Sequence, residues 1–151
     1  MKRTWWIAPA VLLLDQITKI LAQRLPPEGW TLIPGVLGLR LMRNTGMAFS
    51  LLGGHPRLLG VVSLLLIVGT FFLLRKKQMS ILTRVGLTMM LGGAAGNAAD
   101  RLTLGYVTDM VEPLFVNFAV FNLADACLVT GCLLIAINLF RDQPERPNGN
   151  G

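Results

Sequence analysis

Long apolar stretches alternate with polar loops along the chain, and four of them approach the length of a membrane-spanning helix. A helix needs about 20 residues to cross the roughly 30 Å hydrocarbon core of a bilayer. Charged residues interrupt three of the four stretches, which is a first sign of function inside them. We therefore expect an all-α membrane protein in which residues 1–151 form one integral membrane domain. The predicted spans are residues 4–22, 58–74, 81–99 and 119–140.

The segment between the first two spans has a different pattern. Residues 36–43 alternate apolar and polar positions, which is typical of a strand with one covered face. Residues 44–46, Asn-Thr-Gly, are a turn signal, and residues 48–52 can return as a second strand. We expect a small sheet on the outer membrane surface, and a disordered tail at residues 143–151.

Composition and charge favour a membrane protein over a nucleic-acid-binding one. Charged residues make up 15% of the chain, against about 25% in soluble domains. The net charge is +6, but the densest basic cluster is the short loop 75–84 between two spans. The positive-inside rule then places this loop and both termini in the cytoplasm, with residues 23–57 and 101–118 outside. The first span lacks a cleavage signal, so we expect it to be retained.

Acidic residues of the predicted spans gather at one depth. Asp100 lies 16 residues after Arg84, and Asp125 lies 16 residues before Arg141 in a helix of the opposite direction. At a rise of 1.5 Å per residue, both acids sit roughly 24 Å above the inner basic boundary. Four carboxylates are thus expected to converge near the outer leaflet: Asp15, Asp100, Asp109 and Asp125.

Buried charges in a membrane need a reason, because each costs at least about 2.5 to 3.5 kcal/mol at the bilayer centre. Asp15 precedes Lys19 by four residues, so an ion pair is one explanation and a role in a site is another. Asp100 adjoins Arg101, which either neutralises it or binds a substrate carbonyl. The two other acids have no basic residue within four positions, so ion pairing explains them least.

Two of the acids repeat one local pattern, Asn97-x-x-Asp100 and Asn122-x-x-Asp125. In a helix this spacing puts amide and acid on one face. The amide can then orient the carboxylate or bind a substrate backbone. Small residues at positions 92–99 allow another helix or an extended peptide to approach closely.

Five blocks of sequence carry a resemblance to a known family. They read Asp-Gln-Ile-Thr-Lys at 15–19, Asn-Thr-Gly-Met-Ala-Phe-Ser at 44–50, Gly-Gly-Ala-Ala-Gly-Asn-Ala-Ala-Asp-Arg at 92–101, Val-Thr-Asp-Met at 107–110 and Phe-Asn-Leu-Ala-Asp at 121–125. In this order, over nearly the whole chain, they resemble the lipoprotein signal peptidases, or signal peptidase II. Two departures from the family pattern, Met47 and the pair Phe118-Ala119, touch no charged position.

The resemblance implies an aspartic endopeptidase of the bacterial inner (cytoplasmic) membrane. Such enzymes remove the signal peptide from diacylglyceryl-modified prolipoproteins, cutting before the lipidated cysteine. The implied fold has four transmembrane helices, a small extracytoplasmic β-cradle and a short outer helical segment. The implied catalytic pair is Asp109 and Asp125. The residues implied to bind substrate or support the site are Asp15, Lys19, Asn44, Gly46, Asn97, Asp100, Arg101, Asn122 and Ala124.

The sequence offers neither a histidine-based catalytic arrangement nor a metal site, which leaves catalysis by a pair of carboxylates. The only histidine, His55, has no evident acid partner, and no cluster has metal-ligand spacing, so we expect no metal and no cofactor. Two carboxylates about 4 Å apart repel by roughly 4 kcal/mol, so near neutral pH they share one proton. The ionised acid can activate water while the protonated one polarises the scissile carbonyl. Asp100 is expected to stay outside the pair because Arg101 holds it ionised.

Two other functions fit the same spans. A small proton-coupled four-helix exporter would use Asp15 in a dimer. It requires charges distributed through the membrane depth or a deep central acid, whereas these acids cluster outward. A non-catalytic assembly subunit leaves both Asn-x-x-Asp patterns without a role. For the peptidase we expect a monomer, since one chain supplies every acid, with lipid-modified signal peptides and membrane lipid as partners.

Overall fold

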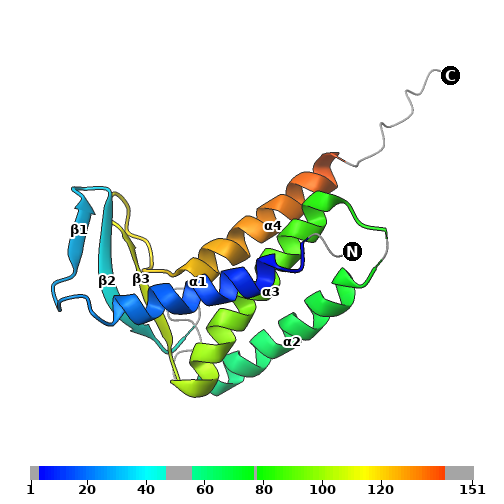
Figure 1. The fold of residues 1–151 in the computed structure, drawn as a ribbon. Coiled ribbons are helices and arrows are strands. Elements are labelled where there is room, and N and C mark those ends of the chain that lie inside the picture. The colour runs from blue at the N-terminus through cyan, green and yellow to red at the C-terminus, as the bar shows by residue number, and fades with distance from the viewer. Residues whose placement is uncertain (1–3, 47–55, 77, 142–151) are drawn as a thin grey trace.

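The computed structural model contains four helices and a three-stranded antiparallel sheet that lies at one end of the helices (Figure 1). It describes residues 4–46, 56–76 and 78–141. The four helices and the small sheet of the prediction are confirmed. In chain order they are α1 (Ile7–Ala22), β1 (Trp30–Ile33), β2 (Leu37–Asn44), α2 (Pro56–Leu74), α3 (Ile81–Thr103), β3 (Val107–Pro113) and α4 (Leu123–Arg141).

Helix α3 is longer than the sequence predicted. Ser80 caps its start, where the hydroxyl accepts a hydrogen bond from the N–H of Thr83 at 3.1 Å. The helix continues past the predicted end at residue 99 because Asp100 is buried inside the protein, only 2% exposed, and does not mark a membrane boundary. Gly105 follows with φ of +78°, a left-handed conformation that favours glycine, and turns the chain into β3.

Helix α4 begins later than predicted, at Leu123 and not at residue 119. Phe121 forms an antiparallel bridge to Val111 of β3, donating at 3.0 Å and accepting at 2.8 Å. This pairing keeps the backbone of Phe121 extended beside the sheet, so the helix starts only after Asn122. Asn122 therefore lies between the bridge to β3 and the first turn of α4.

The sheet has the order β1-β2-β3, and β2 confirms the strand predicted at residues 36–43. The second predicted strand, residues 48–52, lies outside the described residues, as does the predicted tail. Strands β1 and β3 were not predicted from the sequence. Asp109, expected in a short outer segment, lies in β3, which is buried on both faces at its start. Between the long helices, the described part of the chain holds no short outer helix.

Helix α3 packs against each of the other three helices, and glycines lie at its contacts. A Cβ atom added to Gly86 would lie 2.6 Å from the carbonyl oxygen of Gly131 in α4. One added to Gly92 would lie 2.6 Å from the carbonyl oxygen of Ala8 in α1. The backbones therefore approach as closely as small residues allow, as the sequence predicted for positions 92–99.

Substitution of Gly86 by alanine is expected to destabilise the protein by about 1–3 kcal/mol, because α3 and α4 must separate to admit the methyl group. Gly69 in α2 provides the control, since an added Cβ there meets nothing within 4 Å. Gly69→Ala is expected to be neutral or slightly stabilising. Thermal unfolding of the detergent-solubilised variants measures the difference, and equal melting temperatures would contradict the packing interpretation.

The outer surfaces of the helices are apolar. Leu65 and Phe72 of α2 are 68% and 62% exposed, and Phe140 of α4 is 78% exposed. Soluble monomers rarely expose apolar surface this extensively. Within the described residues, α4 is the one helix both long and apolar enough to cross a bilayer, while residues 58–74 are apolar but shorter.

Candidate active site

Lys19 is the central cation of a buried network at the sheet end of the helices. Its Nζ lies 2.8 Å from the Asp15 carboxylate and 3.2 Å from the Asp100 carboxylate. The predicted Asp15–Lys19 ion pair is therefore confirmed. The ion-pair partner of Asp100 is Lys19 of α1, whereas the adjacent Arg101 was the expected cation. A second donor to Asp100 is the backbone N–H of Thr108 in β3, at 2.9 Å.

Asp15 connects α1 to the start of α4. It is fully buried, and its Oδ1 accepts a hydrogen bond from the N–H of Ala124 at 3.0 Å. A carboxylate in this position also benefits from the partial positive charge of the helix N-terminus. Gln16 donates to both Asp15 and Asp100 at 3.2 Å. Gln16 was not among the predicted site residues, although a polar amide inside a predicted span was a signal for it.

Asp109 and Asp125 face the same residue, Asn122. The Asn122 side chain donates from Nδ2 to Oδ1 of Asp109 at 2.7 Å, and its backbone N–H donates to Oδ2 of Asp125 at 3.4 Å. The Asn122 Oδ1 accepts from the N–H of Asp125 at 2.9 Å, which completes a reciprocal capping box. The expected shared helical face is therefore wrong for this pair, because Asn122 precedes α4. One residue bridges the two carboxylates and sets their relative position.

Asn97 of α3 supplies a second oriented amide. Its Oδ1 accepts from Nζ of Lys19 at 3.0 Å and from Nδ2 of Asn122 at 3.1 Å. Lysine only donates, so the amide oxygen must face Lys19 and the amide nitrogen must face the other way. That nitrogen donates to Oδ1 of Asp125 at 2.7 Å. The ion pairs around Lys19 thus extend through Asn97 to Asp125.

Asn44, at the end of β2, supplies a third oriented amide. Its Oδ1 accepts from the N–H of Gly46 at 2.9 Å, and its Nδ2 donates to Oδ2 of Asp109 at 3.0 Å. Arg101 fixes the same turn by donating from Nη2 to the Gly46 carbonyl at 3.1 Å. The Nε of Arg101 is buried and has no hydrogen-bond partner among the described residues. It is a donor available to a ligand.

Asp109 binds its proton more tightly than an ordinary carboxyl group. The pKa of Asp109 is raised from 3.8 to about 6, chiefly by burial and also by the nearby charge of Asp125, although hydrogen bonds from Asn44 and Asn122 and the charge of Lys19 lower it. Asp109 and Asn44 line a cavity of about 430 Å³, at the edge of which Asp109 is only 1% exposed. The described residues contain no group of three His, Cys, Asp or Glu side chains able to hold a metal ion.

Removing the Asn44 donor is expected to raise the pKa of Asp109 further, by about one unit. In the wild-type protein, folded Asp109 keeps its proton up to about pH 6, whereas the unfolded chain releases it near pH 3.8. The free energy of unfolding of the wild type therefore falls as pH rises from about 4 to 6. In Asn44→Ala this fall should continue to about pH 7. Melting temperatures from pH 4 to 8 measure it, with Asn117→Ala, an exposed amide of the same cavity, as the control. An unchanged pH range in Asn44→Ala would contradict the assignment.

Comparison with known proteins identifies relatives over most of the chain. The family model described as Signal peptidase (SPase) II matches residues 7–141. The lipoprotein signal peptidase of Enterococcus faecalis is 42% identical over 139 residues, covering 90% of this chain and 86% of the relative. That of Streptococcus pneumoniae is 36% identical over 156 residues, covering 99% and 100%. A bacterial membrane enzyme solved by the in meso method at 2.3 Å resolution superposes with a TM-score of 0.84 at 28% identity, covering 93% of this chain and 91% of that one.

Proposed function

Because the chain belongs to the signal peptidase II family, we propose that it is an aspartic endopeptidase that removes the signal peptide from diacylglyceryl-modified prolipoproteins, just before the lipidated cysteine. The family processes lipoprotein precursors, and the structural neighbour is a bacterial membrane enzyme. The single observation that carries the aspartic mechanism is the bridge from Asn122 to Asp109 and Asp125.

In the proposed reaction, one aspartate is ionised and the other is protonated. The ionised carboxylate removes a proton from water as the oxygen attacks the scissile carbonyl, and the protonated carboxyl donates a hydrogen bond to that carbonyl. Breakdown of the tetrahedral intermediate transfers a proton to the leaving nitrogen and releases the new carboxyl terminus. The pKa of Asp109, raised to about 6, lies closer to neutral pH than that of an ordinary carboxyl group, which supports a proton shared within the pair. We assign the two roles to the pair and not to individual residues.

The neighbouring polar groups have complementary roles. The amide nitrogens of Asn44, Asn97 and Asn122 each occupy one carboxylate oxygen, which holds the two acids in fixed orientations. The available Nε of Arg101 is suited to bind a carbonyl oxygen of the substrate backbone. The cavity beside Asp109 and Asn44 is the proposed site of the peptide.

All four helices are proposed to span the bacterial cytoplasmic membrane, with both termini in the cytoplasm and the sheet outside. The exposed apolar surfaces of α2 and α4 support contact with lipid. The basic loop at residues 75–84 joins the ends of α2 and α3 that lie away from the sheet (Figure 1). The buried network is assembled from one chain, which supports an active monomer.

The decisive experiment is incubation of the purified protein with a lipid-modified precursor peptide. We expect a product shortened at the bond before the lipidated cysteine, identified by mass spectrometry. The same precursor without its diacylglyceryl group serves as the control and is expected to be cleaved poorly. Absence of cleavage, together with proton-driven solute flux in vesicles, would favour the exporter and overturn the peptidase.

A further inference from the structure

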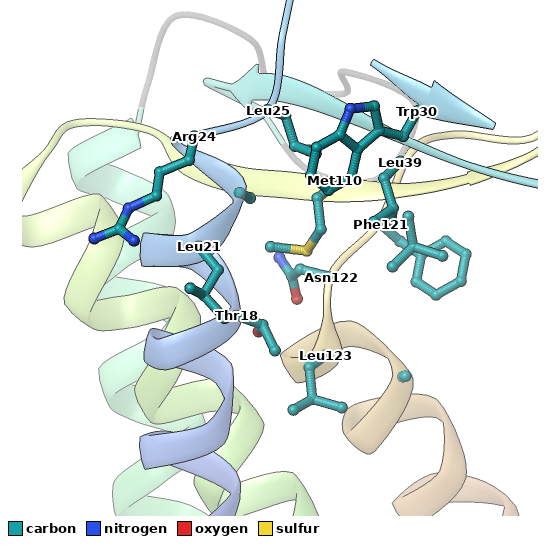
Figure 2. Close-up of a pocket in the computed structure, with 13 residues that line it drawn as sticks. Thr18, Leu21, Arg24, Leu25, Trp30, Leu39, Met110, Phe121, Asn122 and Leu123 are labelled. Carbon is teal, nitrogen blue, oxygen red and sulfur yellow. The ribbon is translucent and has the colours of Figure 1, made fainter. Parts of the chain in front are cut away.

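A second cavity, of about 570 Å³, lies between α1, the sheet and the first turn of α4. Figure 2 shows Leu21 on one side, Leu123 on the α4 side and Trp30 above, with Met110 and Asn122 between the two helices. Leu21 and Trp30 are 54% and 57% exposed, so the cavity opens at the protein surface. The proposed catalytic mechanism assigns this cavity no occupant.

The described residues that line the cavity offer no free polar side chain to a ligand. The Thr18 hydroxyl already donates to the carbonyl oxygen of Asp15 at 2.8 Å. The Asn122 amide is fully buried and engaged on both its oxygen and its nitrogen. The guanidinium of Arg24 points away from the other lining residues (Figure 2). An apolar cavity without free polar partners offers ordered water no hydrogen bonds, so its lining suits a hydrocarbon group.

The size of the cavity favours a long chain over a single side chain. A cavity of about 150 Å³ accommodates one benzene ring, whereas this one measures about 570 Å³. The exposed residues Leu14, Ile17 and Leu21 follow one face of α1 towards it, at helical spacing. This face leads from the lipid-exposed surface of α1 to the cavity, so a chain can enter from the side.

The cavity lies close to the proposed catalytic acids, which indicates which hydrocarbon chain it would bind. Asn122 forms part of its lining and also donates to Asp109. Asp109 itself lines the more polar cavity of Asn44, which suits a peptide backbone. The proposed substrate joins a peptide and a diacylglyceryl group at the residue next to the scissile bond. We propose, on the basis of the proposed function, that the apolar cavity holds one acyl chain of the lipidated cysteine during cleavage.

Chain-length selectivity tests this site. Two precursors with the same peptide would carry either sixteen-carbon or eight-carbon acyl chains. Leu21→Trp and Ala126→Phe reduce the cavity from opposite walls. Each is expected to lower kcat/KM for the long-chain precursor by about tenfold or more, with less than a twofold change for the short-chain one. Ala136→Phe, on the same helix outside the cavity and half-buried like Ala126, is the matched control and should leave both values unchanged.

Equal effects of cavity filling on both precursors, or no effect on either, would overturn the acyl-chain site. Failure of the wild-type protein to cleave either precursor would instead overturn the proposed function. A second measurement needs no substitution: the long-chain precursor carries a photoreactive diazirine at the end of one acyl chain. Labelling of peptides that contain Leu21 or Ala126 is expected. Labelling confined to residues 42–45 or 117–120, or labelling of the cavity only by a diazirine phospholipid, would contradict the proposal.

Discussion

Replacing Asp109 by asparagine is expected to lower kcat for precursor cleavage by about 10³-fold, the scale of a lost general acid or base. Asparagine retains the shape of the side chain but can neither accept a proton from water nor deliver one. Asp125→Asn should have an effect of the same size, and the double variant should be no slower than either single one, because the two carboxyls act as a unit. Single-turnover cleavage of the lipid-modified precursor measures all three.

Glu112 provides the matched control, since it is a carboxylate on the same strand as Asp109 but pairs with Arg40 at 2.7 Å, outside the network. Glu112→Gln is expected to cleave at the wild-type rate and to lose at most about 1 kcal/mol of stability, as for other exposed ion pairs. Melting temperatures near wild type for the aspartate variants would separate lost chemistry from lost fold. Substantial turnover in Asp109→Asn would contradict the assignment of the pair.

The convergence of the acids was predictable because helical rise depends only on sequence spacing. Counting residues from Arg84 and Arg141 placed Asp100 and Asp125 at one depth, and both belong to the observed network. The ion pair between Asp15 and Lys19 was predictable for the same reason, as an interaction within one helix. Residue spacing within single helices was therefore enough to predict that a polar site exists.

Contacts between different helices and strands could not be predicted from residue spacing. The pairing of β3 with β2 brings Asp109 to Asn44, and nothing in the alternation of either strand specifies that register. The bridge between Val111 and Phe121 delays α4 and converts Asn122 from a helix-face residue into a cap. Lys19 pairs with Asp100 across two helices, whereas the sequence suggested the adjacent Arg101. In each case the partner of a side chain is set by tertiary packing and not by proximity in the sequence.

Lys19→Met is expected to destabilise the protein by about 3–5 kcal/mol, because it leaves two buried carboxylates without their cation. Asp15 and Asp100 are 0% and 2% exposed, so solvent does not replace the lost charge. The melting temperature should fall by roughly 10 °C, measured by thermal unfolding in detergent. The charge of Lys19 also lowers the pKa of Asp109, so the activity that remains should show a pH limb moved to higher pH.

Two variants distinguish this role from general packing. Lys76→Met removes an exposed lysine near the end of α2 and should leave both the melting temperature and the pH profile unchanged. The double variant Lys19→Met/Asp15→Asn should recover part of the lost stability, because it removes one uncompensated charge while the new amide oxygen can still accept from the Ala124 N–H. If the double variant is less stable than Lys19→Met alone, charge balance does not explain the buried lysine. If the pH limb stays in place while the melting temperature falls, Lys19 supports the fold without acting on the acids.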